Sequence, residues 1–148
     1  MLPSHRLAIV LTFCAPAAAS AFAESTFTLP PESVQGNVRY VTGGVGFDEA
    51  EAMRRAAVHY PLAIELAARP VPSDSYPRDV YLANVRVDIR DERGQSLIST
   101  TTDGPLLLAS LPPGRYTIDA QIRGVSQRRT VTVGNGGPQR VLFEFAVD

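Results

Sequence analysis

Only two histidines and one cysteine occur among the 148 residues, and this scarcity limits the chemistry that the side chains could perform. Zinc sites, haem, iron–sulfur clusters and thiol catalysis each need several imidazole or thiolate donors at fixed spacings. A hydrolase built on a serine, a histidine and an acid would have to use His59, and no serine follows the nucleophile-elbow pattern. The sequence therefore predicts no cofactor, no metal site and no catalytic residue, so it favours a protein that is not an enzyme.

Paired carboxylates are the next groups whose chemistry must be considered. Asp88 with Asp119, or Asp91 with Glu92, could act as an acid and a base or could bind calcium. Each of these residues falls on the polar face of an expected strand or in a turn, where a solvated charge is the usual role. Calcium would also need a dense cluster of oxygen ligands in a defined loop, and the sequence contains no such loop.

The glycine-rich segment 43–46 precedes an expected helix and so has a superficial likeness to a phosphate-binding loop. The third glycine of the fingerprint is absent, and Asp48 and Glu49 stand where a phosphate would have to approach the helix amides. We therefore expect a tight turn followed by a capped helix. In that helix Asp48 caps the first turn, Glu51 completes a capping box and Phe47 precedes the cap.

The best candidates for a binding site are two tyrosines and an arginine that lead into the second half of the chain. Tyr76 and Arg78 lie in the motif Ser75-Tyr76-Pro77-Arg78, and Tyr81 follows shortly after. Tyrosine and arginine are enriched at contact sites, and loops on a rigid scaffold commonly carry binding residues. The alternative is a plain linker that packs one tyrosine on a sheet.

The charge of the chain is nearly balanced, with 14 basic and 15 acidic side chains and a formal net charge of -1. Every basic side chain is an arginine, because the sequence contains no lysine. Nucleic acids and anionic membranes are bound by concentrated basic surfaces. The composition therefore predicts neither kind of partner.

Residues 1–23 have the pattern of a secretory signal peptide. A short, weakly basic start precedes an apolar run, and the motif Ala21-Phe22-Ala23 has small residues at the two positions that signal peptidase reads. Lipidation of Cys14 is an alternative, although bulky Phe13 precedes it. No other apolar stretch approaches the length of a membrane span. We expect cleavage near Ala23 and a periplasmic or secreted product that does not span the membrane.

The rest of the chain divides into four expected parts. A flexible lead-in covers residues 24–37, a strand–helix–strand element covers 38–68, a proline-rich linker covers 69–78, and a β-sandwich covers 79–148. Helical spacing of apolar residues before Pro61 places the helix between the two strands and ends it near His59 or Tyr60. In the last part apolar and polar residues alternate over short segments that are separated by turn residues. This alternation is typical of two sheets packed through their apolar faces.

Turn motifs in the last part carry a resemblance to a known family. The motif Thr102-Asp103-Gly104 is followed by Leu106-Leu107-Leu108 and then by Leu111-Pro112-Pro113-Gly114-Arg115-Tyr116-Thr117, and an earlier strand ends in the turn 91–94. This pattern, over about residues 80–147, resembles the carboxypeptidase regulatory-like domains. The resemblance implies a mainly β fold, a seven-stranded antiparallel transthyretin-like sandwich, preceded here by the short strand–helix–strand element. Residues 40–66 look like the leader of small exported bacterial proteins that carry such a domain.

The residues of these motifs have structural roles in our interpretation. Asp103 and Gly104 suit a tight turn in which one residue needs a positive φ, and Pro113 and Gly114 set the turn before a strand. Tyr116 is expected to bury its ring while its hydroxyl reaches the backbone near a corner of the sandwich.

Taken together, the residues and the resemblance predict an exported, non-catalytic accessory protein whose sandwich contacts another protein of the cell envelope. The resemblance implies a regulatory, folding-assisting or adhesive role. A carbohydrate-binding module is an alternative that would use polysaccharide as its partner, but the chain has no tryptophan to grip a sugar ring. A hydrolase of unusual design using His59 is a second alternative.

Overall fold

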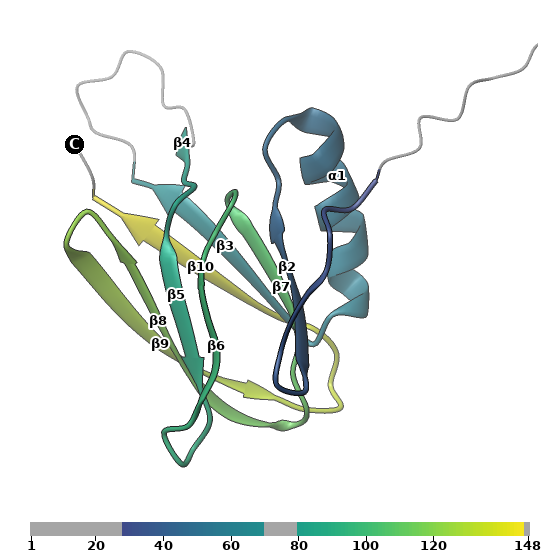
Figure 1. Cartoon of the computed structure of the whole chain (residues 1–148), viewed down its shortest axis with the longest axis vertical. Coiled ribbons are helices and arrows are strands. Elements are labelled where there is room, and N and C mark those ends of the chain that lie inside the picture. The colour runs from purple at the N-terminus through teal and green to yellow at the C-terminus, as the bar shows by residue number, and fades with distance from the viewer. Residues whose placement is uncertain (1–27, 70–79, 147–148) are drawn as a thin grey trace, which may run out of the picture.

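The computed structural model describes residues 28–69 and 80–146 of the chain (Figure 1). The expected signal peptide, residues 1–23, and nearly all of the expected linker lie outside these residues. Within them the fold is mainly β, as the sequence predicts, with a six-stranded sheet, a four-stranded sheet and one short helix. The helical segment consists of α1 (Phe47–Ala56) and the 3-10 turn η1 (Ala57–His59), and so it ends before Pro61, as expected.

The strands of both sheets are interleaved along the chain. The first sheet contains, in order, β1 (Ser33–Gln35), β2 (Val38–Gly43), β7 (Leu106–Ser110), β3 (Leu62–Ala68) and β10 (Gln139–Phe145), with β4 (Val80–Tyr81) paired to β3. The second sheet contains β6 (Ser96–Thr101), β5 (Arg86–Arg90), β8 (Gly114–Ile122) and β9 (Val125–Val133).

The expected strand–helix–strand element is part of the sandwich instead of a separate unit. β7 pairs antiparallel with β2 on one edge and with β3 on the other. β10 pairs with β3 in parallel along its whole length, from Gln139 opposite Leu62 to Phe145 opposite Ala68. A seven-stranded, wholly antiparallel sandwich confined to residues 79–148 is therefore not what forms. The central strand β7 needs partners on both edges to satisfy its backbone groups, and the earlier part of the chain supplies them.

The hydrophobic core lies between the two sheets, where alternate residues of each strand point inward. The expected alternation in the second half of the chain is confirmed, since the apolar residues of β5 and β8 are buried and their polar neighbours are not. The core residues without any exposed surface include Leu62, Ile64 and Leu66 of β3, Val87 and Ile89 of β5, Ile98 of β6, Leu107 of β7, Ile118 of β8, and Phe143 and Phe145 of β10.

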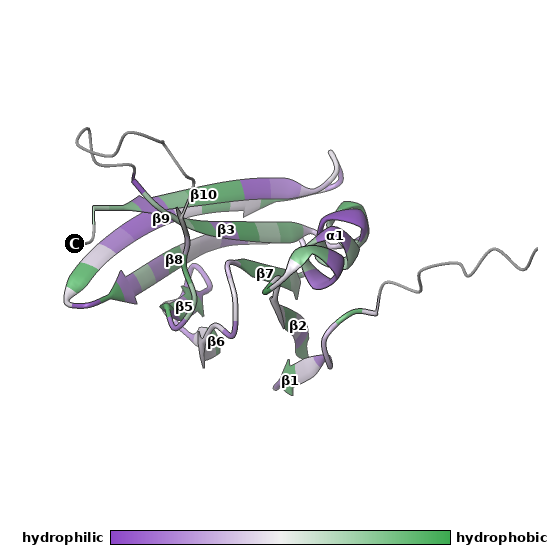
Figure 2. Ribbon diagram, turned by 90° about the horizontal axis from the view of Figure 1, so that it is seen from above, coloured by the Kyte–Doolittle hydropathy of each residue, from purple (hydrophilic) through white to green (hydrophobic). Residues whose placement is uncertain are grey.

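Helix α1 packs against the other face of the first sheet. Figure 2 shows it on the side of this sheet that faces away from β5 and β6. Met53 and Ala57 of the helical segment form a second apolar cluster with residues of β2, β3 and β7, namely Val41, Ala63, Leu106 and Leu108. Because β7 is covered on both faces, its sequence is apolar without alternation, as is typical of a strand buried on both sides.

The start of α1 differs from the expected capping box. The helix begins at Phe47, the N-cap is Gly46, and no side chain caps it, so Asp48 lies within the first turn. Glu49 instead accepts hydrogen bonds at Oε1 from the amides of Gly44, at 2.7 Å, and Val45, at 3.3 Å. The left-handed φ angles of Gly44 (97°) and Gly46 (84°) bend the loop so that these amides face the first turn. Glu51 pairs with Arg55 one turn later, at 3.1 Å.

The Asp103-Gly104 turn has a different physical basis from the expected one. Neither residue has a positive φ, which among described non-glycine residues occurs only at Asn84 and Arg123. Only a glycine fits at position 104, because a Cβ atom there would lie 2.3 Å from the carbonyl oxygen of Gly43. Asp103 accepts a hydrogen bond at Oδ2 from the hydroxyl of Thr42, at 2.7 Å. The turn thus fastens the start of β7 to the end of β2.

The turn before β8 has the arrangement that the sequence predicts. Pro113 lies just before β8, and Gly114 is its first residue. The Tyr116 ring is buried, and its hydroxyl donates a hydrogen bond to the carbonyl oxygen of Pro112 at 2.5 Å. Burial raises the pKa of Tyr116, and the nearby carboxylate of Asp91 raises it further.

Candidate functional site

One of the three predicted binding residues can be placed in the structure. Tyr76 and Arg78 lie outside the described residues, whereas Tyr81 ends β4 with 46% of its surface exposed. The guanidinium carbon of Arg54, on α1, lies 5.9 Å from the centre of the Tyr81 ring, within the range of a cation–π contact. Tyr81 therefore lies on the helix-covered side of the first sheet, and this side carries the candidate site.

A groove, called here the α1–β10 groove, lies beside the helix on this face. It lies between the helical segment, which packs on β2, β7 and Ala63 of β3, and the outer face of β10. The groove has a volume of about 200 Å³, and its walls come from the helical segment, β3, β7 and β10. The residues that line it are Met53, Arg54, Ala57, Ala63, Ile64, Glu65, Leu106, Leu108, Arg140, Val141 and Leu142.

The floor of the groove combines apolar side chains with one carboxylate. Glu65 lies on β3, opposite Leu106 of β7 on one side and opposite Leu142 of β10 on the other. It is half-buried, and among the described residues its carboxylate has neither a hydrogen bond nor an ion pair. Because the side chain is half-buried, water screens a charge pair formed there less than it does at an open surface.

The rim of the groove is more exposed than its floor. Leu142 keeps 49% of its surface exposed although it lies in the middle of a strand. Exposed Arg140 also lines the groove, and within the described residues it forms no ion pair. Large apolar side chains and arginines with this degree of exposure are typical of contact surfaces.

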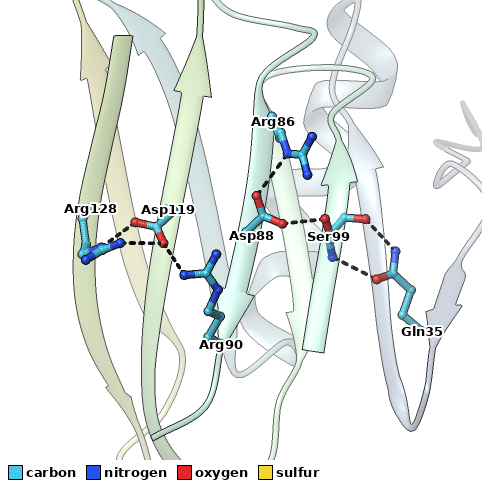
Figure 3. Close-up of polar contacts among 7 residues, drawn as sticks. All are labelled: Gln35, Arg86, Asp88, Arg90, Ser99, Asp119 and Arg128. Atoms are coloured by element: carbon cyan, nitrogen blue, oxygen red, sulfur yellow. Dashed lines mark hydrogen bonds and ion pairs between the residues drawn. The ribbon is translucent and has the colours of Figure 1, made fainter. Parts of the chain in front are cut away.

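The outer face of the second sheet is polar and already paired (Figure 3). Asp88 and Asp119, which the sequence raised as a carboxylate pair, do lie directly opposite each other on β5 and β8. Arg128 binds both oxygens of Asp119, at 2.6 and 3.2 Å, and Arg90 approaches the same carboxylate at 3.4 Å. The bond to Asp119 raises the pKa of Arg128, and the attraction between the two charges adds to this effect.

Asp88 is similarly engaged. It accepts hydrogen bonds from Arg86 Nε, at 3.2 Å, and from the hydroxyl of Ser99, at 2.5 Å. Cross-strand pairing of two like charges is unfavourable, and these arginines offset it. In the part of the chain that the structure describes, no group of three or more His, Cys, Asp or Glu side chains is placed to bind a metal ion.

His59, the residue on which a hydrolase would depend, lies away from the α1–β10 groove. It ends η1 and lines a separate hollow of about 990 Å³ that also includes Ser96 and Ser110. Within residues 28–69 and 80–146 the imidazole forms no hydrogen bond to a serine or a carboxylate.

The sequence alone does not identify most residues of the groove. Two local features of the sequence do relate to it. The run Leu106-Leu107-Leu108 has no alternation, which indicates a strand covered on both faces. Leu142 lies on the exposed face of β10 between Arg140 and Glu144, where an alternating strand would carry a third polar residue. No signal in the sequence identified Glu65 as different from any other polar residue of a half-buried strand.

In the described part of the chain no helix has the length and apolar character needed to cross a bilayer. The sequence matches no protein-family model. No curated protein matches it either.

Proposed function

We propose that this chain is an exported, non-catalytic binding protein that contacts another protein of the cell envelope through the α1–β10 groove. The observation that carries the proposal is the half-buried, unpaired carboxylate of Glu65 on the apolar floor of that groove. The pattern of residues 1–23, which is typical of a signal peptide cleaved near Ala23, supports export.

Glu65 is the group that would select a lysine side chain from the partner, although Arg54 and Arg140 also line the groove. The stem of a lysine is aliphatic and packs well against leucines such as Leu106, Leu108 and Leu142, while its ammonium group pairs with a carboxylate. A neutral apolar side chain would cover the carboxylate without pairing it, which is costly because a buried charge needs a partner.

The arrangement of the strands supports the resemblance to the carboxypeptidase regulatory-like domains. When β1, β2 and the two-residue β4 are set aside, seven strands in two sheets remain: β7, β3 and β10 in one, and β6, β5, β8 and β9 in the other. We propose that these strands are the transthyretin-like sandwich, with its first strand at Leu62–Ala68. The resemblance implies a regulatory, folding-assisting or adhesive role.

A zero-length crosslink between carboxylates and amines tests the proposal. Because the chain contains no lysine, carbodiimide can join Glu65 only to an amine of another molecule or to the chain's own N-terminus. We expect mass spectrometry of envelope extracts treated in this way to find Glu65 joined to a lysine of one recurring partner. The Glu65→Gln variant keeps the shape of the side chain and removes its charge, and should lose at least about tenfold in affinity for that partner, as expected for a desolvated charge pair.

The matched control is Glu92→Gln, which removes an exposed carboxylate in the turn between β5 and β6. Its binding should be unchanged. If Glu65→Gln captures the same protein as strongly as the unaltered chain does, the groove is not the contact site. If extracts return only polysaccharide, the protein partner is wrong and the carbohydrate-binding alternative replaces it.

A further inference from the structure

The open edge of β10 presents a row of backbone groups that nothing in the first sheet satisfies. The amide of Gln139 donates to the carbonyl of Pro61 at 2.9 Å, and the amide of Arg69 donates to the carbonyl of Phe145 at 2.7 Å. In a parallel pair alternate residues bond to the partner strand, so the odd-numbered residues of β10 face β3. The backbone groups of Arg140, Leu142 and Glu144 therefore point away from the sheet.

Side chains bond to backbone groups at some of the other strand edges of the two sheets. On β6 the carboxamide of Gln35 accepts from the amide of Ser99, at 2.9 Å, and donates to its carbonyl, at 3.0 Å (Figure 3). On β9 the side chain of Arg129 donates to the carbonyl of Arg128 at 3.1 Å. β1 has only three residues. Such devices prevent one sheet from pairing with another molecule.

On β10 this protection is confined to one end. The side chain of Gln127 donates to the carbonyl of Glu144 at 2.5 Å. Within the described residues no side chain bonds to the backbone of Arg140 or Leu142. The open groups are thus centred on Leu142, whose side chain is 49% exposed.

The side chains along this edge are complementary to themselves. We propose that β10 pairs antiparallel with β10 of a second copy of the chain, about a two-fold axis at Leu142. In this register Leu142 lies opposite its own symmetry mate, and Arg140 lies opposite Glu144 of the other copy at both ends. Arg140, Leu142 and Glu144 alternate with the inward-facing Val141 and Phe143, so all three side chains lie on the outer face and meet across the axis.

The backbone groups fit the same register. The three residues whose amides and carbonyls point away from β3 are those that an antiparallel partner centred on Leu142 would bond, and each such pair exchanges two hydrogen bonds. The carbonyl of Glu144 has a second lone pair, so it can accept from the partner while it still accepts from Gln127. A two-fold axis closes the assembly at two copies, because both chains use the same edge of β10.

The dimer has a consequence for the α1–β10 groove. Joining two copies along β10 places two grooves side by side on one continuous sheet. A partner with two binding segments would then be held by both grooves at once, which raises its apparent affinity without any new contact. The dimer itself does not depend on the occupant of the groove.

A cysteine at the axis tests the register directly. Residues that exchange hydrogen bonds across antiparallel strands have Cα atoms roughly 5.5 Å apart, a separation that a disulfide can bridge. In a background with Cys14→Ser, Leu142→Cys should form a disulfide-linked dimer on mild oxidation. Val58→Cys is the control, because Val58 is 55% exposed but lies on η1 away from the edge. Val58→Cys should form no disulfide-linked dimer under the same oxidation.

Charge exchange tests the pairing at the two ends. Arg140→Glu places two glutamates opposite each other at both ends, and Glu144→Arg does the same with arginines. Sedimentation over a roughly hundredfold range of concentration should show the unaltered chain dimerising as concentration rises. Each single variant should dimerise at least about tenfold more weakly, and the double variant Arg140→Glu with Glu144→Arg should recover the dimer, as opposite charges pair again.

The proposal fails on any of three results. A folded, unaltered chain that stays monomeric over the whole range overturns it. A dimer that both single variants leave intact places the interface elsewhere, and so does a double variant that dimerises no better than the single ones. Circular dichroism of every variant checks that the loss of a dimer is not a loss of fold.

Discussion

At the scale of single residues, position 104 must be a glycine because a distant part of the chain leaves no room for a side chain. A Cβ atom at this position would lie 2.3 Å from the carbonyl oxygen of Gly43, which is backbone and cannot rotate away. We expect Gly104→Ala to lower the free energy of unfolding by about 1–3 kcal/mol through this overlap. Gly134→Ala, where a Cβ atom meets nothing within 4 Å, should change it by about 0.5 kcal/mol or less. Urea titrations of both variants measure the difference, and equal losses would contradict it.

The role of a residue can be predicted from the sequence when its contact partner is near in the chain, and not when the partner is far away. Tyr116 bonds to Pro112, four residues away, so its role follows from a local motif. Asp103 bonds to Thr42, 61 residues away, and Gly104 is fixed by Gly43, so their motif predicted a turn but not its cause. Glu65 is the extreme case. Alternation places it on the outer face of a strand, but its isolation depends on strands that come from three separate parts of the chain.

At the scale of elements, the start of α1 depends on Glu49 and not on the expected cap. Glu49 accepts hydrogen bonds from the amides of Gly44 and Val45, whereas Asp48 forms no capping bond. We expect Glu49→Ala to cost about 1–2 kcal/mol, because two amides lose a charged acceptor that is partly shielded from water. Asp48→Ala should cost about 0.5 kcal/mol, since Asp48 interacts only with the helix dipole. Thermal unfolding of the two variants distinguishes them, and a larger loss for Asp48→Ala would restore the capping box.

The ends of α1 show why one boundary was predictable and the other was not. Pro61 stops a helix by its covalent structure, and the helical segment ends at His59 as expected. The N-terminus is set by the left-handed φ angles of Gly44 and Gly46, which a sequence of glycines permits but does not require. The order Asp48-Glu49 offers two carboxylates to the same amides. Loop geometry decides which one reaches them.

At the scale of the whole molecule, the sequence predicted two sheets with apolar inner faces but not the chain segments that build them. Periodicity identifies which face of a strand is buried, whereas it contains no information on which strand lies beside it. β3 pairs with β7 and β10, which follow it by many residues, and its own sequence gives no sign of either partner. The proline-rich stretch after β3 therefore predicts a domain boundary, whereas β2 and β3, which precede it, are inner strands of the first sheet.

Truncation at the expected domain boundary tests this interleaving. A fragment of residues 79–148 lacks Leu62, Ile64 and Leu66, which have no exposed surface in the intact fold and are worth roughly 1.5–3 kcal/mol each when buried. That loss is comparable with the total stability of a small domain, about 5–15 kcal/mol, and it also leaves β10 and β7 without their partner. We expect this fragment to give no cooperative thermal transition, whereas residues 28–148, which retain every described strand, should unfold cooperatively. A cooperative transition and dispersed amide resonances from the shorter fragment would contradict this expectation. They would mean that residues 79–148 form a folded core without β2 and β3.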